Sequence, residues 1–549
     1  MVKIIKEEQL KLDKDGLDVY NDIFRYASLG YSAIEEGDLK RFKWFGIYAQ
    51  KPNEGHFMVR IKIAGGQLSP AQLRCIAGLS RDFGLGLADI TTRQTIQLHW
   101  LTIENLPTLI DQLHAVGLYL NTACGDAPRN MVACPLAGVM KDELFDCSHL
   151  AWQVSDMYRD AGKEFSNLPR KFKMSISACP IHCTIPQIHC LSLFGVRRAD
   201  GSVGYGVCVG GGLRNTPHIG QSLRVFIPAG QDKTVLDVYR AVAAIFRDAD
   251  SLRQNRLKAR LKFLVADMGW QAFRDRLEQT LGYAVEHDES IDAPHGATKQ
   301  DHLGHGEQKD GLYFMGIPVP RGRVNDSQLT AMADLAERYA ESGRAAIRLT
   351  PKQNAILLNI PKANLPDLAK ALSDIGLPPY AHALRGALLS CTGTQFCNLA
   401  VVETKQRAAD ILAHLEQTVD IDEPLFISVT GCPNSCSQYQ IADIGLTGVL
   451  MNWGGQPRQD GYHVLLGARL GAEAEFGEFV TDAAGKKLKL PSAEAHVAIE
   501  QLLKAYKAEA VNEGFDEFVR RTDMPQLAQW LTTPAMAAAA AAGAAGEAD

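Results

Sequence analysis

The chain repeats its own sequence, and this duplication restricts its fold more than any other feature. A cysteine motif at residues 175–183 returns at 428–436, with an offset of 253 residues between Cys179 and Cys432. Earlier markers return as well, because 55–58 corresponds to 312–315. We therefore expect two homologous halves that pack about a pseudo-twofold axis, with a shared cofactor between them.

Each copy begins with the same order of expected elements. In the first, a strand (57–63) leads to a helix that Ser69 and Pro70 open, which is a typical helix start. The second copy opens its helix at Asp326 and ends it near Gly343. A strand and a second helix follow, at 87–101 and 106–116 in one copy and at 345–359 and 365–375 in the other. This order predicts a small two-layer α/β unit of the ferredoxin-like kind, used twice.

Four cysteines in the second half have the spacing of a metal cluster. Cys391 and Cys397 are separated by five residues, and Cys432 and Cys436 by three. A four-iron cluster needs four soft thiolate ligands that converge from a chain folding back on itself. A structural zinc site more often shows Cys-x2-Cys pairs in both halves, and a disulfide is disfavoured in a chain without a secretory signal.

This spacing and the core Gly-Cys-Pro-Asn-Ser-Cys at 431–436 resemble the siroheme-dependent assimilatory sulfite and nitrite reductases. The resemblance covers roughly residues 35–520. It implies an α+β fold in which two related siroheme and iron–sulfur domains follow the duplicated ferredoxin-like units. It also implies a [4Fe-4S] cluster on the four cysteines, with Cys436 bridging to the siroheme iron and Asn434 near the cofactor. A shared thiolate couples the two centres and leaves the opposite face of the heme iron open.

The resemblance places the substrate residues in the first half, at Arg60, Arg129, Lys171 and Lys173. Arginine offers a fixed fork to oxyanion oxygens, and lysine is a mobile donor that can pass protons. The alternative for basic residues on strands is a solvated face. Sulfite reductases of this type tend to have Lys-x-Lys at 171–173, whereas the nitrite enzymes tend to have Lys-x-Asn. Lys173 therefore favours sulfite.

Siroheme carries many carboxylates, and two segments resemble the family's siroheme-binding regions. On the expected strand, the resemblance selects Thr92, Arg93, Gln97 and His99; a period of two places the last three on one face. The second segment is Gly210, Gly211 and Gly212, where backbone N–H groups can approach carboxylates. His99 could instead be a hydrogen-bonded core histidine. The triple glycine alone is weak evidence and lacks the dinucleotide-binding pattern.

The first copy departs from the cysteine quartet. Cys134 stands where Cys391 would be expected, but Met140 replaces the second cysteine. Cys179 and Cys183 are therefore interpreted as the remainder of a cluster site that this half of the chain has lost. The alternative is a second metal site formed by four cysteines of this half, Cys124, Cys134, Cys179 and Cys183.

Between the copies, basic and apolar residues alternate at 253–265 with a helical period. This pattern predicts an amphipathic helix whose basic face is either solvated or in contact with siroheme carboxylates or an acidic electron donor. Residues 287–311 are expected to be a polar connector with solvated histidines. The alanine-rich end from Pro534 to Asp549 is expected to be frayed or disordered.

The expected domains follow from these boundaries. They are a helical segment (1–50), ferredoxin-like half-domain 1 (51–120), a siroheme and substrate domain (121–286), a linker (287–311), half-domain 2 (312–379), an iron–sulfur and siroheme domain (380–520) and a terminal segment (521–549).

The net charge of −6 argues against nucleic-acid binding. Without a signal peptide or a long apolar stretch, a cytoplasmic protein that does not enter the membrane is expected.

The resemblance implies an enzyme that delivers six electrons to sulfite and gives sulfide. Nitrite reduction to ammonia at the same site is the close alternative, and a non-catalytic iron–sulfur carrier or redox sensor is a third hypothesis. No nucleotide-binding fingerprint or flavin domain is evident, and so electrons must come from another protein. Ferredoxin is the expected donor, and a flavoprotein reductase is the alternative.

Overall fold

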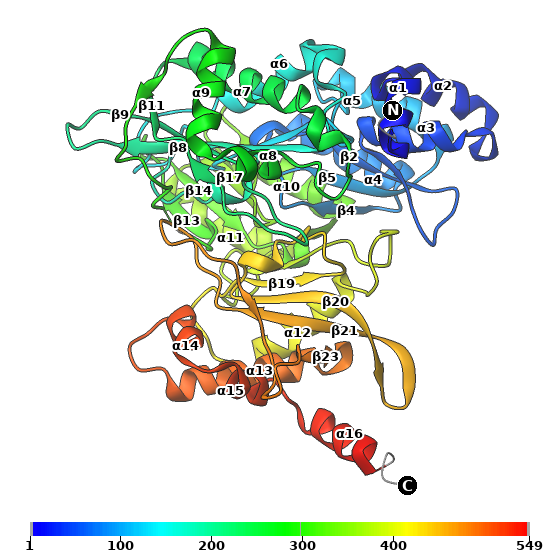
Figure 1. Ribbon diagram of the computed structural model, residues 1–549, viewed down its shortest axis with the longest axis vertical. Coiled ribbons are helices and arrows are strands. Elements are labelled where there is room, and N and C mark those ends of the chain that lie inside the picture. Colours follow the sequence, from blue (N-terminus) through cyan, green and yellow to red (C-terminus); the bar gives the residue numbers. More distant parts are fainter. Residues whose placement is uncertain (1–3, 297, 546–549) are drawn as a thin grey trace. The chain divides into compact units, whose positions relative to one another are not determined.

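The computed structural model describes residues 4–296 and 298–545, and the chain divides into two compact units (Figure 1). Unit 1 runs to residue 212 and continues through 218–298 and 302–380. Unit 2 consists of 213–217, 299–301 and the chain from 381 onward. The main division thus falls one residue from the domain boundary expected at 379.

Helices form most of the first 46 residues of unit 1. Their burial is asymmetric, since α2 turns Ile23 and Tyr26 into the core while Arg25 remains exposed. The three α-helices are α1 (Lys6–Asp13), α2 (Tyr20–Leu29) and α3 (Glu36–Arg41).

Two five-stranded antiparallel sheets form the duplicated half-domains, with the orders β1-β2-β5-β4-β15 and β13-β14-β17-β16-β3. Each sheet ends on a strand donated by the other copy. β15 (Arg323–Asn325) pairs with β4, and β3 (Gln67–Leu68) pairs with β16. The other strands are β1 (Ile47–Ala49), β2 (Phe57–Ile61), β4 (Leu87–Ile90), β5 (Ile96–Leu101), β13 (Gly304–Glu307), β14 (Tyr313–Ile317), β16 (Ala346–Leu349) and β17 (Ala355–Ile360). The exchange is reciprocal, and one hydrophobic core runs through both copies.

The first helix of each half-domain begins with a capping box, at Ser69 as predicted and at Asn325, one residue before the predicted Asp326. Ser69 accepts a hydrogen bond from the Gln72 N–H in a capping box, and Asn325 does the same for the Gln328 N–H. The four helices are α4 (Pro70–Phe83), α5 (Leu106–Ala115), α10 (Asp326–Tyr339) and α11 (Leu365–Asp374). The single strands expected at 87–101 and 345–359 are wrong, because each range is a hairpin of two strands. Gln94 and Gln353 turn the hairpins with positive φ angles of 55° and 65°.

The second part of unit 1 is a seven-stranded mixed sheet of order β12-β11-β9-β8-β7-β6, with β10 paired to β9. β6, β7 and β8 are parallel, and β9 returns antiparallel to β8. The strands are β6 (Pro128–Ala133), β7 (Phe172–Ser177), β8 (Leu191–Arg197), β9 (Val203–Val209), β10 (Gln221–Ser222), β11 (Val225–Pro228) and β12 (Glu286–His287). The helices are α6 (Leu150–Asp160), α7 (Asp232–Arg247), α8 (Leu261–Met268) and α9 (Trp270–Leu281).

Unit 2 repeats this topology. Its sheet has the order β18-β19-β20-β21-β22, in which β18, β19 and β20 are parallel and β21 returns antiparallel. The strands are β18 (Leu388–Ser390), β19 (Ile427–Thr430), β20 (Ile444–Trp453), β21 (Gln456–Leu466), β22 (Glu478–Phe479) and β23 (Lys489–Pro491). The helices are α12 (Lys405–Thr418), α13 (Ala495–Glu509), α14 (Phe515–Arg521), α15 (Met524–Trp530) and α16 (Pro534–Ala545). α12 and α13 pack together beside the strands (Figure 1).

Three local expectations are wrong. The basic segment at 253–265 is no continuous helix, because only α8 from Leu261 onward is an α-helix there. The expected connector contains β13, which pairs with β14. The alanine-rich end forms α16 as far as residue 545, since alanine has the highest helix propensity; the expectation for 546–549 lies outside the described residues.

A buried ion cluster fixes the N-terminal helices to the mixed sheet of unit 1. Asp126, which is 2% exposed, accepts from Arg256 at 2.5 and 3.0 Å, and Lys11 lies 3.5 Å away. Burial alone would raise the pKa of Asp126, but Arg256, and then Lys11 and Arg170, outweigh burial and lower it. The stabilisation is therefore present at neutral pH and is lost as the pH falls through this lowered pKa.

We expect Asp126→Ala to reduce the free energy of unfolding by about 3–5 kcal/mol, because it leaves buried cations without their carboxylate. Urea unfolding followed by circular dichroism measures the change. Asp250→Ala is the control, since that side chain is 95% exposed and lies 3.8 Å from Arg253. Equal unfolding midpoints for the two variants would contradict the prediction.

Candidate active site

The cysteine quartet of unit 2 lies where two parallel strands end. Cys391 directly follows β18, and Cys432 follows β19 by two residues. Because β18 and β19 are parallel neighbours, their carboxyl ends meet at one edge of the sheet. The distant halves of the motif are thus joined by strand pairing, and the Cys391 N–H donates to the Val429 carbonyl at 3.2 Å.

Short loops carry the remaining two cysteines. Gly393 adopts a φ of 67°, where a Cβ would lie 2.5 Å from the Thr404 hydroxyl, so glycine is required at this turn. The Cys397 N–H then donates to the Gly393 carbonyl at 3.0 Å. Cys436 is the exposed member of the quartet.

Hydrogen bonds favour the thiolate form of these cysteines, but burial and the neighbouring sulfurs oppose it. The Gly431 N–H donates to Cys391 Sγ at 3.2 Å, and Asn434 Nδ2 donates to Cys432 Sγ at 3.4 Å. Burial, followed by the neighbouring Cys436, raises the pKa of Cys391 to about 12. Four adjacent thiolates thus need a cationic centre to hold them together, which is what iron supplies.

The distances between the four cysteine sulfurs are suited to a metal cluster, which is larger than a single metal ion. Among the residues that the structure describes, no three of these sulfurs lie within 4.8 Å of one another. A cube of iron and sulfide separates its ligands, whereas a single ion draws them together. The quartet therefore fits the cluster predicted for it.

Unit 1 brings together the basic residues predicted for the substrate. Arg60 lies on β2, Arg129 on β6, Lys173 on β7 and Lys171 just before β7. The pKa of Lys171 is well below its ordinary value, first because of burial and then because of Lys173 and other cations. These side chains thus form one region of concentrated positive charge.

Arg93 joins this region from an unexpected position. It lies in the turn between β4 and β5, not on a strand, and one of its Nη atoms donates to the Asn130 carbonyl. Burial, and then Arg129, lower the pKa of Arg93 to about 9, which leaves it charged at neutral pH. Thr92 lies in the same turn.

Arg260 is a member of this region that the sequence analysis did not single out. Only 5% exposed, it is one of the cations that lower the pKa values of Lys171 and Arg93. Contact of this basic segment with siroheme carboxylates was one of the two interpretations of its pattern, but the helical period did not distinguish Arg260 from its basic neighbours. Lys262 is also buried, at 3% exposure, whereas Lys258 of the same segment is exposed, so the basic residues of 253–265 do not share one solvated face.

Within the basic region of unit 1, three guanidinium groups each offer a buried donor to an anionic ligand. The Nε atoms of Arg93, Arg129 and Arg260 are buried and have no hydrogen-bond partner among the described residues. Leaving a buried charged donor unsatisfied is costly. Carboxylate and oxyanion oxygens are the acceptors that suit this donor set.

The other predicted cofactor residues are already engaged within the protein. His99 is fully buried, and its ring nitrogens lie 3.1 Å from Gln50 and from Asp89, which favours a structural histidine. Gln97 is 5% exposed on β5. The Gly210 and Gly212 N–H groups donate to the Cys190 and His218 carbonyls. At Gly211, a Cβ would lie 2.2 Å from the Gln187 carbonyl, so backbone packing explains this glycine.

Cys124 lies among the cations and not with the other cysteines of its half. Arg60 Nη1 donates to its Sγ. Burial alone would raise the pKa of Cys124, but Arg60 and Arg129 outweigh burial and lower it. The four-cysteine site considered for this half is therefore divided, and Cys124 belongs to the anion-binding region.

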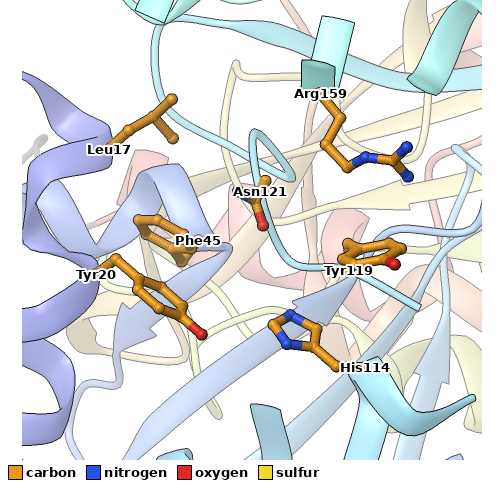
Figure 2. A pocket seen from close by; sticks show the side chains of 7 residues that line it. All are labelled: Leu17, Tyr20, Phe45, His114, Tyr119, Asn121 and Arg159. Atoms are coloured by element: carbon orange, nitrogen blue, oxygen red, sulfur yellow. The ribbon is translucent and has the colours of Figure 1, made fainter. Parts of the chain in front are cut away.

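A separate pocket of about 390 Å³ in unit 1 has a different character (Figure 2). Its lining includes Tyr20, Phe45 and Tyr119, with Arg159 as its charged residue. The Arg159 guanidinium lies 4.8 Å from the Tyr119 ring centroid and pairs with Asp156 at 2.6 Å. None of the predicted site residues lines this pocket.

Fold and site together define an α+β iron–sulfur redox protein with an anion-binding region. Residues 124–284 and 383–537 match the nitrite and sulphite reductase 4Fe-4S domain, and residues 48–116 and 306–375 match the ferredoxin-like half domain of nitrite and sulfite reductases. The chain belongs to the nitrite and sulfite reductase family, a family of oxidoreductases, and it carries an iron–sulfur cluster. The predicted family and the duplicated ferredoxin-like fold are confirmed.

The relatives of this chain include proteins named as nitrite reductases and proteins named as sulfite reductases. The chain is 40% identical over 488 residues to a ferredoxin–nitrite reductase of Synechococcus elongatus, covering 87% of this chain and 92% of that protein. It is 35% identical over 550 residues to a sulfite reductase [ferredoxin] of Mycobacterium tuberculosis, covering 95% of each. The solved structure of M. tuberculosis NirA matches with a TM-score of 0.88 at 34% identity, covering 96% of this chain and 98% of that one. Among the described residues, no helix has the length and apolar character needed to cross a bilayer.

Proposed function

We propose that this protein reduces sulfite to sulfide with six electrons from ferredoxin, using siroheme and a [4Fe-4S] cluster. Cys391, Cys397, Cys432 and Cys436 would hold the cluster, and Cys436 would also help to hold the siroheme. The observation that carries this proposal is the set of buried Arg93, Arg129 and Arg260 Nε atoms without partners. A non-catalytic electron carrier or redox sensor does not require an anion-binding site of this kind.

The guanidinium groups of Arg93 and Arg260 suit the siroheme carboxylates, since arginine binds carboxylates with a planar fork. When bound, siroheme supplies an iron that takes electrons from the cluster and passes them to the substrate. Thr92 and Gln97 are the further candidates for this cofactor. Asn434, which donates to Cys432 Sγ, orients a cluster ligand.

Arg60, Arg129, Lys171 and Lys173 are proposed to bind and protonate the substrate. The arginines hold oxyanion oxygens and balance the charge that grows as S–O bonds break. Lys171 has a lowered pKa, and so it releases a proton more readily than an ordinary lysine. Each electron that enters can thereby be matched by a proton.

Nitrite reduction to ammonia is the second candidate, because a relative named as a nitrite reductase is 40% identical. Lys173 favours sulfite, since a second ammonium suits a dianion. The donor is proposed to be ferredoxin, after the names of the relatives, with a flavoprotein reductase as the alternative.

The proposal is tested with the purified holoenzyme. An absorption spectrum with a Soret band and a red band supports siroheme, whereas a broad brown shoulder alone contradicts it. The ratio of kcat/KM for sulfite and nitrite, with reduced ferredoxin or methyl viologen, then decides the substrate. A strong preference for nitrite rejects the sulfite assignment.

We expect Lys173→Asn to shift the sulfite-to-nitrite ratio of kcat/KM toward nitrite on the order of tenfold, the equivalent of about 1.4 kcal/mol. The physical reason is the loss of one positive charge beside a dianion. Lys258→Asn is the matched control, because Lys258 is exposed. An unchanged ratio in Lys173→Asn shows that this residue does not select the substrate.

A further inference from the structure

Unit 1 contains a second group of potential metal ligands outside the proposed active site. The Sγ atoms of Cys134 and Cys183 and a ring nitrogen of His302 all lie within 4.8 Å of one another. Among the described residues, this is the one group of three His, Cys, Asp or Glu side chains with such close ligand atoms. Cys179 is in side-chain contact with Cys134 and supplies a fourth candidate.

The duplicated fold explains how the three cysteines meet. Cys134 directly follows β6, and Cys179 follows β7 by two residues, as Cys391 and Cys432 follow their own parallel strands. Cys183 corresponds to Cys436. The sheet therefore delivers three thiols to one edge, as it does in unit 2.

Met140, which replaces the second cysteine of the quartet, lies beside Cys179. Its Sδ is 3.5 Å from Cys179 Sγ. A thioether here cannot provide the fourth thiolate of an iron cube.

His302 completes the set from the segment that links the two halves. This segment is tied to the cysteine loop, because the Gly296 N–H donates to His182 Nδ1 at 3.2 Å and Gln187 Nε2 donates to the Pro294 carbonyl at 3.3 Å. Gly316 lets the His302 backbone approach, since a Cβ there would lie 1.8 Å from the His302 carbonyl oxygen. The expected solvated histidine is therefore half-buried at the thiols.

We propose that Cys134, Cys179, Cys183 and His302 bind one zinc ion in a tetrahedral structural site. Three thiolates and one imidazole are a common ligand set for structural zinc, with Zn–S bonds of about 2.3 Å and Zn–N bonds of about 2.0–2.1 Å. These bond lengths place tetrahedral ligand atoms roughly 3.5–4 Å apart. The ligand atoms of Cys134, Cys183 and His302, which lie within 4.8 Å of one another, need only small side-chain movements to reach that spacing, and Cys179 joins them through its contact with Cys134.

The buried position supports a structural role. Cys134, Cys179 and Cys183 are 3%, 1% and 3% exposed. A structural zinc site uses all its ligands and leaves no open position for substrate. The ion fastens the ends of β6 and β7 to the linking segment, and it is redox-inert, so the electron path does not include it.

Metal analysis of the purified holoenzyme, grown with zinc and dialysed against a weak chelator, tests the site. We expect about one zinc per chain, and X-ray absorption at the zinc edge should show three sulfur ligands and one nitrogen. Less than about a tenth of a zinc per chain would overturn the proposal. So would iron and sulfide in excess of one four-iron cluster and one siroheme, or a disulfide among these cysteines.

Variants separate the site from a general effect on folding. Cys183→Ser and His302→Ala should each lower the zinc content at least fivefold, and His302→Cys should retain zinc because it restores four ligands. Cys208→Ser is the matched control, since Cys208 is a fully buried thiol on β9 beside Phe194. If a variant is insoluble, the zinc content and the zinc-edge X-ray absorption spectrum of the unaltered protein still show whether the site binds zinc. Full zinc content in both Cys183→Ser and His302→Ala would refute the assignment of these residues as zinc ligands.

Discussion

Cys432→Ser is expected to remove the iron–sulfur cluster and to reduce the turnover of both sulfite and nitrite by more than about 10³-fold, or on the order of 4 kcal/mol. A hydroxyl is a hard, weakly acidic ligand that cannot replace a soft thiolate on iron. The three remaining thiols, with pKa values raised for Cys391 and Cys397, return to their neutral form. Iron and acid-labile sulfide analysis, together with steady-state rates, measures the result.

Cys75→Ser is the control for this change, because Cys75 is a half-buried thiol on α4 outside both cysteine groups. It should keep the full iron and sulfide content and the full rate. A Cys432→Ser protein that retained four irons and four sulfides per chain would show that the quartet is not the ligand set.

Lys171→Gln is expected to lower kcat/KM for sulfite by roughly 10²–10³-fold while the cluster stays in place, because it removes both a charge and a proton donor. Lys258→Gln, at an exposed position, should leave the rate unchanged. A Lys171→Gln variant with ordinary kcat/KM and normal cofactor content would exclude Lys171 from the reaction.

The same lysine predicts a pH dependence. Its pKa lies well below the ordinary 10.5, first because of burial and then because of Lys173 and Arg260. A lysine loses its charge as the pH rises through its pKa, and so sulfite affinity should fall on the alkaline side at a pH below 10.5. Lys171→Arg keeps its charge over this range and should flatten that limb of the KM profile, even if kcat is lower.

Sequence reasoning identified the parts of the site that depend on spacing and repetition. The cysteine quartet and the related pair Cys179 and Cys183 follow directly from the duplicated motif. The parallel strands β18 and β19, which end before Cys391 and Cys432, bring the two halves of the quartet together. The start signal at Ser69 and Pro70 located the first helix of the repeat, and the start expected at Asp326 is correct although Asn325 supplies the capping side chain.

The remaining features depend on contacts between distant segments, which periodicity does not encode. The basic segment at 253–265 has a helical pattern, but Arg256 is drawn to Asp126 and Arg260 is buried near Lys171. Arg93 occupies a hairpin turn because Gln94 takes a positive φ. His302 reaches the cysteines only because Gly316 allows its backbone close approach.

The exchanged strands β3 and β15 have a consequence for synthesis of the chain. Ala88 on β4 pairs with Val324 on β15, which lies 236 residues later. At about 5–20 residues per second, a ribosome needs roughly 10–50 s to supply that partner. During this interval the nascent half-domain exposes an unsatisfied sheet edge, which is a site for mispairing with other chains. The sheet of the first half-domain is therefore completed only after Asn325 has been synthesised, when more than half of the chain has been translated.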